Sequence, residues 1–382
     1  QSYLDAWEDY QRSLLKASFP KWDYIILTAS NEEQGKSFEK QIEYRREKKV
    51  LPETTKFLVI PDPQGKRVGS GGATLHVLRT LSEQEGFCGN FYGKRILVIH
   101  SGGDSKRGPQ YSICGKLFSP EGMLVLSGDV LLLFNPLQID SQFSGAAAIS
   151  MKSPLEIGKD HGVFLNDGTD HVQKFLHKQS TQTLIDLGAV NEQGNVDLDT
   201  GAVLCDAKLV SALFSLISDH GIVNEEKYRL FVNEKSRISF YGDFLYPLAS
   251  DSTLEQYYKE QPEGVFCEEL RQCRKKIWET LCEFRMKLIC LSPAEFIHFG
   301  TTRELLKLLT EEIQDYEFLD WSANVFTNIE MKGCAIHDGL VEADVELEEG
   351  TYIEGSWLSG NTVIRSGAIV SQMIVKDVTV PK

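Results

Sequence analysis

Short apolar runs alternate with glycine loops and helical patterns along most of the chain. The segment Tyr24–Ser30 reads YIILTAS and precedes a charged helical pattern, while Phe57–Leu81 passes from an apolar run through a glycine loop into a helix. The runs RILVIH (Arg95–His100), MLVLSGD (Met123–Asp129) and GAAAISM (Gly145–Met151) continue the series. Strands that alternate with helices indicate βαβ units and an α/β fold with a mostly parallel sheet. Ligands of such sheets bind at the carboxyl ends of the strands.

One interval does not fit this pattern. Only six residues separate Lys116 from Met123, and Pro120 and Gly122 are among them. A parallel crossover needs about a dozen residues or more, usually with a helix. Either the strands are antiparallel here or the sequence omits a stretch, and we favour an omitted stretch near Pro120–Glu121.

The last part of the chain has a different pattern. The helical segments LRQCRKKIWETLCEFRM and TTRELLKLLTEEI flank two strand-like runs, KLICLS and EFIHFG. After Asn328, short β-like pieces follow, with apolar or small residues at every sixth position: Val345, Thr351, Trp357, Val363, Ile369 and Val375. This period is typical of hexapeptide β-helix repeats, with an antiparallel β end-piece as the alternative. We therefore expect two domains, residues 1–328 and a β-helix-like domain at 329–382, with Trp357 buried between coils or covered by a partner.

The composition of the chain argues against some classes of function. The chain has 382 residues, 42% hydrophobic and 25% charged, with a formal charge of −15. This charge argues against a nucleic-acid or membrane-surface binder, which needs a basic face. The eight cysteines form no Cys-x-x-Cys pair and are expected to be reduced core thiols, and no apolar run is long enough to span a bilayer. A cytoplasmic location is expected.

Two glycine loops follow apolar strands. The first contains Gly69, Ser70, Gly71 and Gly72, directly before a helical pattern. Glycines allow a ligand to approach the backbone, and the start of the next helix favours an anion. We expect these residues to bind a nucleotide phosphate, with a tight strand-to-helix turn as the alternative.

The second loop, SGGDSKRGPQYSICGK, is the more basic one. It supplies backbone access and donors for an anion from Gly102, Gly103, Ser105, Lys106, Arg107 and Lys116. Because the chain as a whole is acidic, several cations in one loop indicate that the loop binds an anion. A triphosphate is an anion that would suit them. We expect Arg107 and Lys116 to act in the chemistry, whereas Lys106 alone could equally be a solvated surface lysine.

Asp129 ends an apolar strand after Gly128. A carboxylate there is costly unless it is hydrated, caps a helix or binds a metal. Mg²⁺ takes one or two carboxylates together with phosphate oxygens. Asp129 and Asp243, in the motif YGDFL, are therefore candidate Mg²⁺ ligands, and a helix cap is the alternative, more serious for Asp243.

The ordered set of motifs resembles the fucose-1-phosphate guanylyltransferase (GDP-L-fucose pyrophosphorylase) family, whose members occur alone or fused to a fucokinase. The resemblance rests on DPQGKRVGSGGATL and HSGGDSKRGPQYSICGK, followed in the family's order by SGDVLLLF, HGVF, FLHKQS, YGDFL and FIHFGTT. The family has a longer segment after the position of Lys116, so the resemblance says little about that wall of the site.

The resemblance implies a Rossmann-like nucleotidyltransferase domain followed by the β-helical tail. It implies that L-fucose 1-phosphate attacks the α-phosphorus of GTP with Mg²⁺, giving GDP-L-fucose and pyrophosphate. Lys178 in FLHKQS is similar to the lysine that contacts the sugar phosphate in related enzymes, though it could be a solvated lysine. Asp197 and Asp199 could meet sugar hydroxyls or cap a turn, and the histidines of these motifs are assigned no chemistry.

Three alternatives stay open. The chain could act on another sugar 1-phosphate or nucleotide, since guanine and fucose come from the resemblance alone. It could be a non-catalytic assembly subunit, although Arg107, Lys116 and Asp129 are all present. It could also be one half of a bifunctional chain with a sugar kinase, and a homo-oligomer is possible because the tail is expected to be a stacking or assembly module.

Overall fold

The structure, a computed structural model, describes residues 21–47, 49, 51–101, 121–135, 138–140, 142–319, 321–371 and 373–382, together with Leu4, Asp5, Glu8 and Arg12. Contacts within the chain divide it into two units, residues 2–296 and 297–382. The predicted boundary between residues 328 and 329 lies inside the second unit. The helices that precede the last strands pack on those strands, which explains the earlier boundary.

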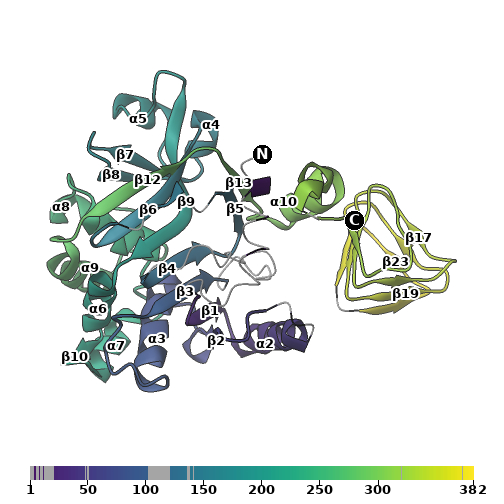
Figure 1. The fold of residues 1–382 in the computed structure, drawn as a ribbon, viewed down its shortest axis with the longest axis horizontal. Coiled ribbons are helices and arrows are strands. Elements are labelled where there is room, and N and C mark those ends of the chain that lie inside the picture. Colours follow the sequence, from purple (N-terminus) through teal and green to yellow (C-terminus); the bar gives the residue numbers. More distant parts are fainter. Residues whose placement is uncertain are drawn as a thin grey trace. The chain divides into compact units, whose positions relative to one another are not determined.

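A nine-stranded mixed sheet organises the first unit (Figure 1). Its main path runs β12-β6-β9-β4-β3-β1-β2, and β7 and β8 extend from β9. The strands are β1 (Tyr24–Ala29), β2 (Lys56–Pro61), β3 (Arg95–His100), β4 (Gly122–Ser127), β6 (Ala146–Pro154), β7 (Gly162–Asn166), β8 (Val172–His177), β9 (Asn195–Cys205) and β12 (Met286–Leu291). Neighbours on the path are parallel, except that β9 is antiparallel to both β4 and β6. The mostly parallel α/β sheet predicted from the sequence is therefore confirmed.

The direction of β3 and β4 excludes one of the two explanations of the short interval before Met123. Strands β3 and β4 pair in parallel, from Arg95 with Gly122 to His100 with Ser127. The antiparallel alternative is therefore wrong. The expected omission near Pro120–Glu121 stays a prediction, because residues 102–120 lie outside the described part of the chain.

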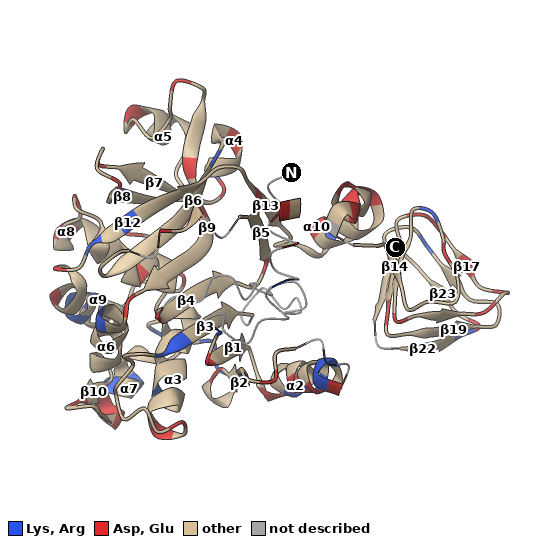
Figure 2. Cartoon of the chain, viewed as in Figure 1, with Lys and Arg blue, Asp and Glu red and all other residues tan. Residues whose placement is uncertain are grey.

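Helices and short elements complete the first unit. The α-helices are α2 (Glu32–Glu47), α3 (Gly69–Glu83), α4 (Leu155–Gly158), α5 (Thr181–Asp186), α6 (Ala207–Ser215), α7 (Glu225–Phe231), α8 (Leu254–Tyr257) and α9 (Glu268–Leu281). The short helices are η1 (Pro63–Gly65), the π-helix η4 (Phe240–Phe244) and η5 (Tyr246–Leu248), and the short strands are β5 (Val130–Phe134), β10 (Ser218–Asp219), β11 (Ile222–Val223) and β13 (Ala294–His298), which pairs with β5. Charges of both signs cover α2 (Figure 2), whose buried residues are Gly35 and Phe38.

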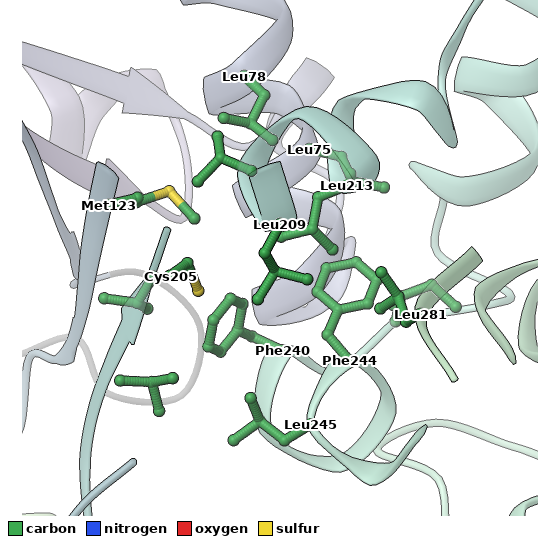
Figure 3. Packing of buried hydrophobic residues seen from close by; sticks show 14 of the residues in the cluster. Leu75, Leu78, Met123, Cys205, Leu209, Leu213, Phe240, Phe244, Leu245 and Leu281 are labelled. Atoms are coloured by element: carbon green, nitrogen blue, oxygen red, sulfur yellow. The ribbon is translucent and has the colours of Figure 1, made fainter. Parts of the chain in front are cut away.

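The alternation of side chains along β4 divides the core between the two faces of the sheet. Met123 and Val125 belong to the larger cluster, and Leu124 to the cluster of the opposite face. Figure 3 shows the larger cluster, in which Met123 lies among side chains of α3, α6, α9 and η4. This two-sided burial explains the continuous apolar runs of the central strands.

The second unit consists of helices followed by three small parallel sheets. Its helices are α10 (Thr302–Lys307), the π-helix η6 (Leu308–Glu312) and η7 (Ile313–Leu319). The sheets are β14 (Asn324–Val325), β15 (Ala335–His337), β18 (Tyr352–Glu354) and β21 (Ile369–Ser371); β16 (Leu340–Val341), β19 (Trp357–Ser359) and β22 (Ile374–Lys376); and β17 (Glu346–Leu347), β20 (Val363–Ile364) and β23 (Thr379–Val380). From β15 onward the chain visits the three sheets in turn, so the alternative of an antiparallel end-piece is wrong.

The repeat differs in detail from the predicted one. From β15 onward, partner strands are offset by seventeen residues, as in Leu340 with Trp357 and Trp357 with Ile374, except that β20 and β23 are offset by sixteen. The buried column is Val341, Leu347, Ile353, Leu358, Ile364, Val370 and Val375, so two steps of six alternate with one of five. A strict six-residue column therefore drifts out of register. Trp357 points outward and is 44% exposed, which makes the prediction that it is buried between coils wrong.

Two further expectations concern cysteines and membrane spans. The seven cysteines in the described ranges are all free, but Cys88 and Cys290 are exposed, so the expectation of core thiols holds only in part. Among the described residues, no helix is long and apolar enough to cross a membrane.

Candidate functional site

The site begins where β3 and β4 end. The backbone N–H of Gly128 donates to the carbonyl oxygen of His100 at 3.1 Å. A Cβ at Gly128 would lie 2.7 Å from that oxygen, so only glycine allows this approach. The next residue, Asp129, is half-buried, and its carboxylate accepts a hydrogen bond from the Ser127 hydroxyl. This places a carboxylate at the ligand-binding edge of the sheet.

Strand β9 brings a second carboxylate to the same edge. The antiparallel register of β4 and β9 ends at Leu126 with Ala202, and three further residues along each strand lead to Asp129 and Asp199. The β9 backbone bulges at this point, where Gly201 has a φ of +70° and faces Ser127. Asp129 and Asp199, seventy residues apart in the chain, are thereby both brought near Tyr241, whose pKa each of them raises.

Tyr241 lies beside both carboxylates. Its hydroxyl donates to the carbonyl oxygen of Gly201 at 3.1 Å. Burial, followed by the charges of Asp199 and Asp129, raises the pKa of Tyr241 well above its usual value. Burial also raises the pKa of Asp199 from 3.8 to about 6, although the Gly201 N–H donates to this carboxylate at 2.9 Å. A buried carboxyl with a raised pKa favours a cationic partner.

The donor set fits a cation that is shared with a ligand. Within the described ranges, no group of three or more His, Cys, Asp or Glu side chains could hold a metal ion by itself. Mg²⁺ binds in nucleotide sites through one or two carboxylates and completes its octahedron with phosphate oxygens and water. Asp129 and Asp199 match this requirement.

Asp243 is engaged elsewhere. The sequence pairs Asp243 with Asp129 at a metal, but its side chain is only 2% exposed and forms an ion pair with Arg274 at 2.9 Å. Its other carboxylate oxygen accepts from the Ser239 N–H at 2.7 Å, and the Tyr257 hydroxyl adds a further contact. These contacts correct the prediction, because they occupy both oxygens in the protein interior.

The first glycine loop forms the start of α3. The N–H groups of Gly71 and Gly72 donate to the carbonyl oxygen of Ile238, at 2.8 and 3.3 Å. A Cβ at Gly71 would lie 2.8 Å from the Ile238 side chain, and Gly69 has a φ of +79°. Close packing against the segment before η4 therefore gives Gly71 and Gly72 a structural reason that differs from the tight strand-to-helix turn considered as the alternative. Phosphate binding by this loop stays a prediction.

The π-helix η4 connects these parts of the site. Its first N–H, of Phe240, donates to the Ser70 hydroxyl at 2.8 Å, and its second residue is Tyr241. The His100 ring lies edge-on to the rings of both Phe240 and Tyr241, at 5.8 and 6.1 Å between centroids. Asp243 fixes the same turn to Arg274 of α9. Single-turn π-helices often occur at functional sites, and this one links the glycine loop to the carboxylates.

His100 is held neutral. Its Nε2 lies 3.0 Å from the Thr74 hydroxyl, and burial lowers its pKa to about 4. Sequence reasoning assigned no role to His100 and used the motif YGDFL only for its aspartate. Tyr241 lies in the same motif, two residues before Asp243, so the motif itself is a sequence signal for it.

Lys178 reaches this edge through its backbone. The Lys178 N–H donates to the carbonyl oxygen of His161 at 2.9 Å, and its side chain is exposed. Gly162, the residue after His161, lies against Asp199, since a Cβ at Gly162 would be 2.9 Å from the Asp199 carboxylate. The motifs HGVF, FLHKQS and VDLDTGAV therefore meet at one place, and sugar-phosphate binding by Lys178 and Asp199 stays a prediction.

The basic loop cannot be placed. Gly102, Gly103, Ser105, Lys106, Arg107 and Lys116 all lie in residues 102–120, outside the described part of the chain. In the sequence, this segment follows Ser101, the residue after β3. Its predicted contacts with a triphosphate stay predictions.

Comparison with known proteins gives a consistent answer. The profile of the fucose pyrophosphorylase domain matches residues 119–382. The chain is 27% identical to the fucose-1-phosphate guanylyltransferase of Mus musculus over 431 residues, covering 94% of this chain and 70% of that protein. The protein of the same name from Homo sapiens is 28% identical over 427 residues, covering 94% and 68% of the two chains.

A third relative is longer. The bifunctional fucokinase/GDP-fucose pyrophosphorylase of Arabidopsis thaliana is 24% identical over 352 residues, which cover 76% of this chain and 32% of that protein. Because the domain profile matches well over half of the sequence, the chain belongs to the fucose pyrophosphorylase family.

Proposed function

We propose that this chain is a sugar-1-phosphate nucleotidyltransferase that converts GTP and L-fucose 1-phosphate to GDP-L-fucose and pyrophosphate. The observation that carries the proposal is its membership of the fucose pyrophosphorylase family, with relatives named fucose-1-phosphate guanylyltransferase aligned over 94% of the chain. The two carboxylates at the carboxyl edge of the sheet support it independently. Loss of those groups would be expected of a non-catalytic relative.

The reaction needs positioning more than proton transfer. A phosphate oxygen of the sugar phosphate forms a bond to the α-phosphorus of GTP, and the bond from that phosphorus to the oxygen bridging to the β-phosphate breaks. Pyrophosphate leaves with the electron pair. Since the nucleophile is already an anion, no general base is required. The main task of the protein is to hold several anions close together.

A divalent cation fits at Asp129 and Asp199. We propose Mg²⁺ as the ion, and it would supply positive charge at the transferring phosphoryl group. Asp199, buried with a raised pKa, would be held in its ionised form by such a cation. Tyr241 would fix the bulge that positions Asp199, through its bond to Gly201.

We propose that the triphosphate of GTP and the phosphate of the sugar bind to different cationic side chains. Arg107 and Lys116, with Lys106 and the backbone of Gly102 and Gly103, would bind the triphosphate, whereas Lys178 would bind the sugar phosphate. The entering and leaving groups lie on opposite sides of the α-phosphorus in an in-line transfer. The backbone contact of Lys178 with His161, next to the start of β7, supports a place for Lys178 on the β7 side of Asp199.

Titration calorimetry tests this division. Lys178→Ala should weaken binding of fucose 1-phosphate and leave GTP binding nearly unchanged, and Arg107→Ala should do the reverse. GTP should also bind more tightly than ATP, UTP or CTP to the unmodified chain. Equal losses for both ligands in both variants would mean that one undivided pocket holds both phosphates.

The winding of the second unit supports a β-helix. Three parallel sheets visited in turn from β15 onward, with partners offset by sixteen or seventeen residues, match the expected hexapeptide architecture apart from one shortened side. We propose a β-helical module that contributes to assembly rather than to chemistry, and a cytoplasmic location for the protein.

A further inference from the structure

The three sheets of the second unit present three different outer faces. In the sheet β14-β15-β18-β21, the outward column is Ala335, Tyr352 and Ile369. This column is covered by the chain's own helices, since Ala335 and Tyr352 cluster with Leu309 and are almost fully buried. The apolar outer column of this sheet is therefore buried under helices of the same chain.

The second face is polar. In the sheet β17-β20-β23, Glu346 pairs with Val363 and Val363 with Thr379. Glu348 and Arg365 follow these residues and form an ion pair on the surface. Such a face is stable in contact with water.

The third face, on β16-β19-β22, is apolar and exposed. Its outward column is Leu340, Trp357 and Ile374, in direct register, with exposed fractions of 47%, 44% and 78%. Met373, just before β22, is also 55% exposed. We call the column Leu340–Trp357–Ile374 the apolar face. Aligned large side chains of this kind indicate an interaction surface rather than scattered exposure.

The charged residues beside the apolar face indicate which kind of partner surface would complement it. Two residues further along these strands stand Glu342, Ser359 and Lys376, one from each coil; Glu342 and Lys376 are exposed, and Ser359 between them is buried. Glu342 lies on this face, because its carboxylate accepts a hydrogen bond from the Trp357 indole at 3.1 Å. An acid at one end, a neutral residue in the middle and a base at the other end form a self-complementary pattern.

We propose that two copies of this chain associate through the apolar face, about a two-fold axis that lies between the copies, parallel to the strands and over Trp357 of β19. Rotation about this axis reverses the order of the coils. Trp357 then meets Trp357 of the second copy, Leu340 meets Ile374, and Glu342 meets Lys376 twice. Isologous contacts require this kind of pairing, in which residue i meets j and j meets i.

The expected dimer is reversible. A standard interface buries about 800 Å² on each partner, which is more than three short strands provide. The apolar column would supply most of the affinity, and the two Glu342–Lys376 pairs would fix the orientation and make association weaker in high salt.

Sedimentation velocity of the full chain across a wide concentration range tests the proposal. The unmodified chain should shift from monomer to dimer, and Ile374→Glu should abolish the shift. Val265→Glu is the matched control, because Val265 is equally exposed at 78% but lies in the first unit. Circular dichroism should show that both variants stay folded.

Charge reversal tests the orientation. Glu342→Lys and Lys376→Glu should each weaken dimerisation at low salt, and the double variant should restore it. A chain that stays monomeric at every concentration would overturn the proposal and leave the apolar face to a different protein. Dimers that persist in Ile374→Glu, or charge reversals that do not compensate, would also overturn it.

Discussion

At the scale of single residues, the two carboxylates of the site have different environments. Asp129 is half-buried and bonded to the Ser127 hydroxyl, so it has polar support within its own turn. Asp199 has a pKa raised to about 6 by burial and lies in a bulge that Tyr241 fixes. A cation at this edge would therefore stabilise the ionised form of Asp199.

Asp129→Asn should leave the fold intact and reduce the rate of pyrophosphate release by at least about 100-fold, because a metal near the transferring group contributes several kcal/mol. Steady-state kinetics at saturating Mg²⁺ measure the effect. Asp251→Asn is a suitable control, since Asp251 forms only a surface ion pair with Lys174. An unchanged rate would show that Asp129 serves only to hold its turn.

The pKa of Asp199 predicts a pH dependence. A carboxyl whose pKa is raised on folding stabilises the folded state below its unfolded value of 3.8, and this contribution is lost as the pH rises through about 6. Without metal, the melting temperature of the unmodified chain should therefore fall relative to Asp199→Asn as the pH rises from 4 to 7. Added Mg²⁺ should stabilise the unmodified chain above pH 6 and lose this effect below it. Identical melting profiles for the two chains at every pH would contradict the assignment.

Sequence reasoning reached only part of this constellation. Asp129 was found because a carboxylate at the end of an apolar strand is costly without a partner. Its neighbour could not be identified, because the choice between Asp199 and Asp243 depends on the antiparallel register of β9, a tertiary feature without a local signal. Asp243 follows a glycine as Asp129 does, yet its environment is a buried ion pair.

At the scale of elements, η4 holds the site together. It is bonded to the glycine loop through Ile238 and Ser70, and to α9 through Asp243 and Arg274. The sequence predicted the strands and helices around it, because their periodic patterns are local and strong. The π-helix has no such pattern, and its position depends on the buried pair.

Arg274→Met should lower the free energy of unfolding by about 3–5 kcal/mol, since it leaves the Asp243 carboxylate buried without its partner. Urea denaturation measures this loss. Combining Arg274→Met with Asp243→Leu should recover part of the stability, because the uncompensated charge is removed as well. Lys275→Met, at the next and exposed position of α9, is the control and should change stability little. A single variant as stable as the unmodified chain would show that η4 does not depend on this pair.

At the scale of the whole molecule, every described residue of the site lies in the unit formed by residues 2–296. The second unit has its own core and its own cover of helices. The sequence predicted short repeated strands here, but counted six residues a side. In the structure, every third step between buried positions is five residues long, as from Ile353 to Leu358, so a strict six-residue count loses the register.

Truncation should separate the two units. A chain that ends after Gly300, before α10, should stay soluble and keep its turnover per folded molecule. A chain that ends after Asn328 keeps α10 and η6 but loses Ala335 and Tyr352, which cover Leu309. It should aggregate, because an apolar helical face is left in water. Light scattering and activity of the two proteins measure this difference, and a soluble but inactive shorter chain would contradict a site confined to the first unit.

The most direct test of the proposed function is the reaction itself. Purified chain with Mg²⁺ and GTP should be given L-fucose 1-phosphate or another sugar 1-phosphate, with pyrophosphate release followed and the product identified by mass spectrometry. We expect GDP-L-fucose to form fastest, with little turnover when ATP, UTP or CTP replaces GTP. A faster reaction with a different sugar 1-phosphate would reassign the substrate, and no pyrophosphate with any of them would contradict the assignment as an enzyme.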